Sequence, residues 1–134
     1  MDAEETVRDY YEALRRGEPL SPYFAEDEDL VKCGISERLV GDDEVAGGLR
    51  EQSRRTEAWT VESEKLRVTE RETVAWFADR VGMGWTDTER GSRFEFDTRW
   101  SGTLERESRT RGESDDAPGD WRFVLMHVST AGDV

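Results

Sequence analysis

Three side chains of this sequence have the chemistry of catalytic groups. His127 is the only histidine, and an imidazole with an unperturbed pKa near ~6.5 can act as a general acid or base. Tyr10 carries a hydroxyl that can orient a substrate oxygen. Cys33 is the only cysteine, and a thiol becomes a nucleophile where its pKa is lowered. Each also has an ordinary structural alternative: a histidine hydrogen-bonded in the core, a tyrosine filling a helix face and a small buried thiol.

Motif spacing predicts no metal or cofactor site. A single cysteine excludes an internal disulfide and a multi-cysteine metal cluster. The sequence also lacks a glycine-rich loop with the spacing of a phosphate-binding motif. We therefore expect neither a metal nor a cofactor.

The composition is strongly acidic, with 32 Asp and Glu against 19 Lys and Arg and a net charge of −13. Such a surface repels phosphates, so nucleic-acid binding is not expected. Only Lys32 and Lys65 are lysines, which resembles the proteins of extreme halophiles; a GC-rich genome that favours arginine codons is the alternative. No apolar run approaches the roughly 20 residues of a membrane span, and the N-terminus lacks signal-peptide features. We expect a cytoplasmic protein that binds no membrane.

The first element that could position a functional group is an amphipathic helix over residues 3–16. Asp2 is a suitable N-terminal cap, and Gly17 is a natural C-terminal stop. One helical face carries Val7, Tyr10, Tyr11 and Leu14 at the spacing of a buried stripe. The sequence then predicts a short strand over 30–34 and a second helix that begins at 41–43, where acidic residues lie near the positive end of the helix.

The remainder of the chain reads as β structure. We expect a long strand over 59–68 with a bulge near 63–65, a strand over 73–81, and a half-buried strand over 93–105. Residues 82–87 are either a continuation of the second strand or a loop. Residues 106–120 contain Gly and Pro but no large apolar side chain, which predicts an exposed loop.

The last predicted strand, over 121–129, is apolar on both faces. Strict alternation puts Trp121, Phe123, Leu125, His127 and Ser129 on one face, and Val124, Met126 and Val128 on the other. A strand that is apolar on both faces must be covered on both sides. We expect the rest of the chain to cover one face and a second copy of the chain to cover the other.

Helices followed by a run of strands predict an α+β fold, with helices on one face of a mostly antiparallel sheet. The segments 24–27 (FAED), 41–46 (GDDEVA) and 121–129 (WRFVLMHVS), in this order, resemble the SnoaL-like branch of the NTF2-like (ketosteroid-isomerase-like) superfamily. The resemblance spans nearly the whole chain and implies one domain over residues 1–134. It also implies a cone, in which a curved sheet wraps around N-terminal helices and encloses an apolar pocket, and a homodimer formed through the outer sheet face.

Ketosteroid-isomerase chemistry is not expected from this sequence. It requires a tyrosine on the first helix, which Tyr10 matches, and a carboxylate base near the end of the first strand. Counted from segment 24–27, the position of the base falls at Lys32 or Cys33, and neither is a carboxylate. The second acid that the chemistry requires would lie on the strand over 93–105, where Asp97 is expected to point away from the apolar face.

Two functions of different class therefore remain open. The first is a small-molecule pocket, enzymatic or not, for a hydrophobic or aromatic ligand, with His127 and Tyr10 as polar contacts and candidate catalytic groups. The other residues expected to contact the ligand are Trp59, Trp76, Trp100, Phe24, Cys33 and Phe123. The second is a non-catalytic dimeric module, in which the outer faces of 74–78 and 124–128 matter more than a pocket. Met126→Arg is the substitution expected to break that dimer.

Overall fold

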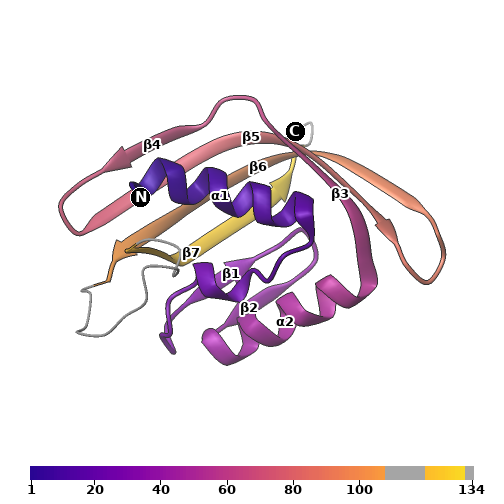
Figure 1. The fold of residues 1–134 in the computed structure, drawn as a ribbon, viewed down its shortest axis with the longest axis horizontal. Helices are drawn as coiled ribbons and strands as arrows, with labels where there is room; N and C mark the ends of the chain where they lie inside the picture. Colours follow the sequence, from indigo (N-terminus) through magenta and orange to yellow (C-terminus); the bar gives the residue numbers. More distant parts are fainter. Residues whose placement is uncertain (108–119, 132–134) are drawn as a thin grey trace.

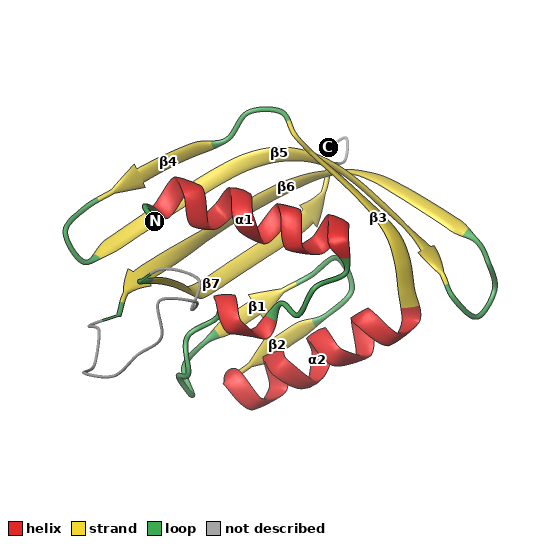
Figure 2. Ribbon diagram, in the orientation of Figure 1, coloured by secondary structure: helices red, strands yellow, loops and turns green. Residues whose placement is uncertain are grey.

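The computed structural model describes residues 1–107 and 120–131. Two α-helices and a short 3-10 turn cover one face of a sheet (Figures 1 and 2). In chain order the elements are α1 (Ala3–Arg16), η1 (Ser21–Tyr23), β1 (Val31–Cys33), β2 (Arg38–Val40), α2 (Asp42–Arg55), β3 (Thr56–Ser63), β4 (Arg67–Glu70), β5 (Val74–Asp87), β6 (Arg93–Arg106) and β7 (Trp121–Thr130). Most of the loop predicted over 106–120 lies outside the described residues.

The first helix has the predicted bounds because its two caps act as expected. The Asp2 carboxylate accepts a hydrogen bond from the backbone N–H of Glu5 at 2.8 Å. Gly17 ends the helix in the left-handed conformation with φ 68° and donates to carbonyls of the last turn. The buried face includes Val7, Tyr10 and Tyr11, so α1 directs both tyrosines towards the sheet.

In the described part of the chain the sheet has seven strands in the order β2-β1-β7-β6-β5-β3, with β4 pairing to β5 as well. All neighbours are antiparallel except β1 and β7, which are parallel. The sheet curves around α1, and α2 lies beside the end formed by β1 and β2 (Figure 1). This arrangement confirms the predicted α+β class, with helices inside a curved, mostly antiparallel sheet.

The predicted alternation of β7 is wrong beyond its first residues, because the strand contains a bulge. Leu104 of β6 pairs with Phe123, whereas the preceding residue, Thr103, pairs with Leu125. The extra residue reverses the side-chain alternation. Trp121 and Phe123 therefore point inward as predicted, but in the second half of the strand Met126 and Val128 are the buried residues.

A glycine on the neighbouring strand makes room for this bulge. A Cβ atom on Gly102 would collide with the backbone oxygen of Leu125 and would lie 2.7 Å from Cε1 of Phe77. A glycine inside a strand commonly marks a bulge or a close backbone approach. Gly102 was thus the sequence signal for the irregularity in β7.

The strand predicted over 59–68 is in fact two strands. Strands β3 and β4 both pair with β5, and residues 64–66 connect them. The bulge lies earlier than predicted, between Glu57 and Thr60. Within it Ala58 has φ 53°, a left-handed conformation that costs a residue with a Cβ roughly 1–2 kcal/mol. Strand β5 includes the segment 82–87 as one continuous strand, and β2 was not predicted.

No helix in the described part of the chain is both long enough and apolar enough to cross a membrane.

Candidate functional site

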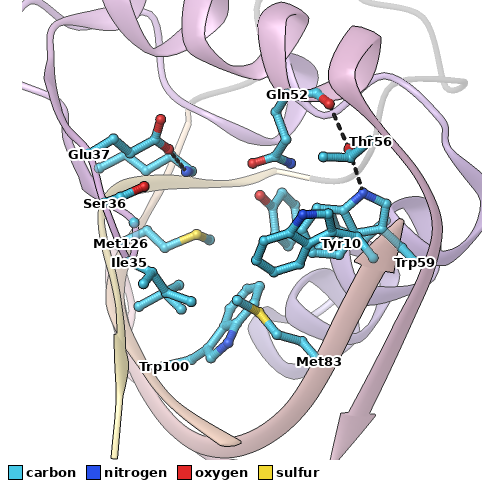
Figure 3. A pocket seen from close by; sticks show the side chains of 15 residues that line it. Tyr10, Ile35, Ser36, Glu37, Gln52, Thr56, Trp59, Met83, Trp100 and Met126 are labelled. Carbon is cyan, nitrogen blue, oxygen red and sulfur yellow. Dashed lines mark hydrogen bonds and ion pairs between the residues drawn. The ribbon is translucent and has the colours of Figure 1, made fainter. Parts of the chain in front are cut away.

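A cavity of about 150 Å³ lies between α1, α2 and the concave face of the sheet (Figure 3). Its walls are mostly apolar, and a few polar groups gather at one end. The lining residues are Tyr10, Leu14, Lys32, Gly34, Ile35, Ser36, Glu37, Gln52, Thr56, Trp59, Met83, Trp85, Trp100, Met126 and Val128. Ile35 and Ser36, in the turn between β1 and β2, are exposed, so this turn forms part of the rim.

Tryptophan rings form much of the apolar wall. Trp59 of β3 stacks on Trp85 of β5, with ring centroids 4.9 Å apart and planes at 27°. The indole N–H of Trp59 donates to Oγ1 of Thr56 at 2.8 Å, and Thr56 in turn donates to the backbone oxygen of Gln52 at 2.6 Å. The indole N–H of Trp100 is likewise satisfied by Thr98 at 2.9 Å. The N–H groups of Trp59 and Trp100 are therefore occupied locally, and these two rings offer the cavity apolar surface.

An ion pair forms the polar end of the cavity. Nζ of Lys32, on β1, lies 2.7 Å from Oε1 of Glu37, and the Lys32 side chain is only 6% exposed whereas that of Glu37 is 35% exposed. Figure 3 marks this pair with a dashed line beside Glu37. Gly34 permits the arrangement, because a Cβ there would lie 3.0 Å from both Cγ and Oε1 of Glu37. The tight turn thus folds the Glu37 carboxylate back over the lysine.

Tyr10 faces the cavity with a hydroxyl that makes no hydrogen bond within the described residues. Its ring is fixed by edge contacts to Phe24 and Phe123, with centroids 5.8 and 5.3 Å away, and by contacts to Tyr23 and Trp100. Burial raises the pKa of Tyr10 above its ordinary value, and the negative charge of Glu37 adds to this effect. The hydroxyl is therefore a neutral donor, held by a rigid ring and open to an acceptor in the cavity.

The neighbouring tyrosine has a different, structural role. The Tyr11 hydroxyl donates to Oδ2 of Asp79 at 2.9 Å. Asp79 is buried and also accepts from the Ser63 hydroxyl at 2.6 Å and from the backbone N–H of Lys65 at 2.9 Å. This network fixes α1 to the connection between β3 and β4. Tyr10 and Tyr11 are thus adjacent tyrosines, of which one is free to bind a ligand and the other is occupied.

The structure separates the predicted site residues into three groups. Tyr10, Trp59 and Trp100 line the cavity. Phe24 and Phe123 do not line it; they are buried behind Tyr10 and contact its ring. The remaining three residues, His127, Trp76 and Cys33, are outside the cavity: Trp76 is 43% exposed on the convex face, and Cys33 and His127 are paired neighbours across β1 and β7.

The orientation predicted for His127 is corrected by the bulge in β7. The side chain is exposed on the outer face of the sheet, beside Cys33 of β1 and Ser101 of β6 in the strand register. Because the bulge reverses the alternation, Met126 takes the inward position instead. Met126 is fully buried, so Met126→Arg would disrupt the core rather than test a dimer interface.

Lys32, Glu37 and Gln52 are among the polar cavity residues that sequence reasoning missed. The resemblance points to the position of Lys32 but implies a carboxylate there, so the pattern does not assign the lysine itself a role in the cavity. Of the two residues counted to the position of the catalytic base, Lys32 faces the cavity and Cys33 does not. Asp97 points outward as predicted and contacts Arg80, with Oδ2 3.2 Å from Nη2. Nothing in the sequence pattern pointed to Glu37 or Gln52, since each depends on how a turn or a helix faces the sheet.

The arrangement combines two kinds of chemical capability. The Tyr10 hydroxyl and the Lys32 ammonium are buried donors that can polarise a carbonyl oxygen bound in the cavity. The Glu37 carboxylate can accept a proton from a neighbouring group. Figure 3 shows Gln52 extending from α2 into the cavity, between Glu37 on one side and Trp59 on the other. Its side-chain amide makes no hydrogen bond within the described residues, so it is a further polar contact for a ligand.

Comparison with known proteins identifies the family. Residues 3–132 match the SnoaL-like domain, whereas no curated protein matches the chain. An NTF2-like superfamily protein from Salmonella enterica serovar Typhimurium LT2 has a similar structure, with a TM-score of 0.77, 12% identity, and coverage of 97% of this chain and 89% of that one.

Two further structures show the same fold. A ketosteroid isomerase-like protein from Erwinia carotovora atroseptica SCRI1043 gives a TM-score of 0.71 at 16% identity and covers 97% of this chain and 94% of that one. An NTF2-like protein of unknown function from Pseudomonas putida KT2440 gives 0.71 at 14% identity, with 98% and 85% covered. The structural similarity establishes the fold, whereas sequence identities this low do not transfer an activity, which has to be argued from the site. The chain belongs to the SnoaL-like family and has the NTF2-like fold.

Proposed function

We propose that the protein binds a small, neutral, largely aromatic molecule whose polar end is a carbonyl oxygen. The observation that carries this proposal is the free hydroxyl of Tyr10 in an aromatic-walled cavity, beside the Lys32–Glu37 ion pair. A carbonyl oxygen has two lone pairs and can accept from both the hydroxyl and the ammonium. Binding would give the free donor of Tyr10 the acceptor that it lacks.

The size of the cavity limits the ligand. A dry cavity of roughly 150 Å³ lined by apolar side chains is large enough to hold benzene, whereas sites for drug-sized molecules occupy roughly 300–1,000 Å³. The cavity here is about 150 Å³. It therefore suits a single ring with a short substituent, with the substituent directed towards the polar end, and it is too small to enclose a steroid.

Electrostatics favour a neutral ligand over an anion. Lys32 and Glu37 carry opposite charges at 2.7 Å, so the polar end has no net charge to offset an entering carboxylate. An anion would also lose its hydration while lying near the Glu37 carboxylate, and an uncompensated buried charge is costly. A neutral carbonyl oxygen receives the hydrogen bonds without that cost.

Ligand-observed fluorine NMR at high KCl tests this proposal with three probes of similar size. We expect para-fluoroacetophenone and fluorobenzene to bind saturably, and para-fluorobenzoate to bind at least about tenfold more weakly than para-fluoroacetophenone. Tyr10→Phe should weaken binding of the ketone by about 2- to 12-fold, which corresponds to one hydrogen bond of about 0.5–1.5 kcal/mol. Binding of fluorobenzene should not change.

Tyr11→Phe is the matched control, because it removes a hydroxyl from the adjacent residue without altering the cavity lining. It should leave the affinity for both neutral probes unchanged. Binding of neither neutral probe would contradict the proposal. An equal effect of Tyr10→Phe on ketone and fluorobenzene would contradict the assigned role of the hydroxyl.

A homodimer through the outer sheet face is a second proposal, which the exposed apolar side chains on that face support. Trp76 and Leu125 are 43% and 42% exposed. They lie in one row across the sheet, because Thr103 of β6 pairs with both of them and Val31 of β1 pairs with Leu125. A second copy that covers this row would bury them.

Leu125→Glu tests the dimer at a position where the charge would remain in solvent in a monomer. We expect multi-angle light scattering at high KCl to show a dimer for the wild type and a folded monomer for the variant. Ser129→Glu, on the same strand but outside the apolar row, is the control and should remain dimeric. A monomeric wild type, or a dimeric Leu125→Glu protein, would contradict this interface.

A further inference from the structure

The lysine in the cavity is an exception in a chain that otherwise uses arginine. Of the 19 basic residues, all except Lys32 and Lys65 are arginines. Lys32 projects from β1 into the cavity, and its side chain is 6% exposed. A guanidinium does not lose its proton in proteins, whereas lysine amines serve as Schiff-base nucleophiles. The structure therefore places one of its two lysine amines, largely buried, at the wall of the cavity.

Glu37 is positioned to take a proton from the Lys32 ammonium, which cannot act as a nucleophile while its nitrogen is fully protonated. Its Oε1 lies 2.7 Å from Nζ of Lys32, within direct hydrogen-bond distance. Transfer of one proton across this contact would give a neutral amine and a neutral carboxyl group, and the neutral amine is the form that attacks a carbonyl carbon. Glu37 is 35% exposed at the rim, so solvent reaches its side chain.

We propose that Lys32 forms a Schiff base with the carbonyl carbon of a small aromatic aldehyde or ketone bound in the cavity. This inference rests on the proposed function, since the carbonyl must first bind. Lysine amines in apolar pockets are established nucleophiles towards carbonyl groups in other enzymes. The present assignment depends on the arrangement of Lys32, Glu37 and Tyr10 around one cavity.

The atoms and charges of the step balance as follows. Glu37 takes a proton from the Lys32 ammonium, and the free Nζ attacks the carbonyl carbon while the C=O π electrons move to oxygen. The Tyr10 hydroxyl donates a hydrogen bond to that oxygen, which takes a proton from the new N–H group and becomes the hydroxyl of a carbinolamine. Glu37 then returns its proton to this hydroxyl, the C–O bond breaks, and water leaves. The aldehyde and the ammonium together give a protonated imine and one water.

Reductive trapping tests the inference on the intact protein. The probe is para-fluorobenzaldehyde with sodium cyanoborohydride, which reduces an imine to a stable secondary amine. Intact mass spectrometry should show the gain of one fluorobenzyl group, and peptide mapping should locate it on Lys32. We expect Lys32 to be labelled roughly tenfold or more faster than Lys65, because the cavity raises the local concentration of the aldehyde.

Two controls separate this step from unspecific labelling. Fluorobenzene in excess should protect Lys32 but not Lys65, and this comparison needs no variant. Lys32→Arg should abolish the fast labelling, whereas Lys65→Arg should leave it unchanged. Glu37→Gln should slow trapping because the proton acceptor is lost.

The outcomes distinguish this inference from the proposed function. Saturable binding of para-fluoroacetophenone together with Lys32 labelling no faster than that of Lys65 would overturn the Schiff-base step and leave the binding proposal standing. Absence of saturable binding by any neutral probe would overturn both. Fast labelling of Lys32 that fluorobenzene does not reduce would place the reaction outside the cavity and also overturn the inference.

Discussion

The adjacent tyrosines of α1 give a stability prediction that depends directly on the geometry of the cavity. Tyr11→Phe removes a hydrogen bond of 2.9 Å to the buried Asp79 carboxylate, and hydrogen bonds to charged groups contribute about 1.5–3 kcal/mol. The free energy of unfolding should fall by about this amount. Asp79 keeps two other donors, so the protein should still fold.

Tyr10→Phe removes a hydroxyl that has no hydrogen-bond partner within the described residues. The free energy of unfolding of the ligand-free protein should therefore change by less than about 0.5 kcal/mol, or rise slightly, because no hydrogen bond is lost. Urea unfolding at constant high KCl, followed by circular dichroism, measures both variants against the wild type. The large difference between two chemically identical substitutions at neighbouring positions is the expected result.

Equal destabilisation by the two substitutions would refute this reasoning. It would mean that the Tyr10 hydroxyl already has a partner in the folded protein and is not available to a ligand. A stable Tyr11→Phe protein would instead contradict the structural role assigned to Asp79.

Three further predictions follow from other parts of the structure. Gly102→Ala should lower the free energy of unfolding by about 1–3 kcal/mol, because the new methyl group would meet the Leu125 backbone oxygen; unchanged urea unfolding would contradict the bulge. Raising KCl from about 0.1 M to 1 M should raise the thermal unfolding midpoint, because salt screens repulsion in a chain with net charge −13; a falling midpoint would contradict this. In an absorbance titration, all three tyrosines should ionise above pH ~10 in the folded protein, because burial, more than neighbouring charges, raises the pKa of each. Since the folded pKa values exceed the unfolded ones, the contribution of the buried tyrosines to the free energy of unfolding should be fully present below pH ~10 and should be lost as the pH rises above it. Tyrosinate absorbance near pH ~10 in the folded protein would contradict the burial.

Much of the fold could be predicted because local chemistry and tertiary structure agree in it. The cap at Asp2, the stop at Gly17 and the apolar stripe between them defined α1, and the same stripe placed Tyr10 against the sheet. The alternating segment over 93–105 likewise defined β6, whereas for β5 the pattern predicted a strand only as far as residue 81. Each of these signals lies within a single element, where periodicity is reliable.

The candidate site was predicted only in part because it depends on interruptions of that periodicity. One extra residue in β7 reverses the direction of the side chains that follow it, so Met126 rather than His127 points into the core. Lys32 and Glu37 meet through a tight turn at Gly34, and a hydropathy pattern does not describe such a turn. Gly102 was the one visible sign of the bulge, and it becomes informative only when the pairing of β6 with β7 is known.

The cavity beside Tyr10 is proposed to accept a small neutral carbonyl compound. A crystal structure of the protein soaked with para-fluoroacetophenone tests it most directly. We expect the aromatic ring to lie between Trp59 and Trp100, with the carbonyl oxygen within hydrogen-bond distance of the Tyr10 hydroxyl. Ligand density elsewhere on the protein, or a cavity closed by a rotated Trp59 with the Tyr10 hydroxyl bonded to protein, would contradict it.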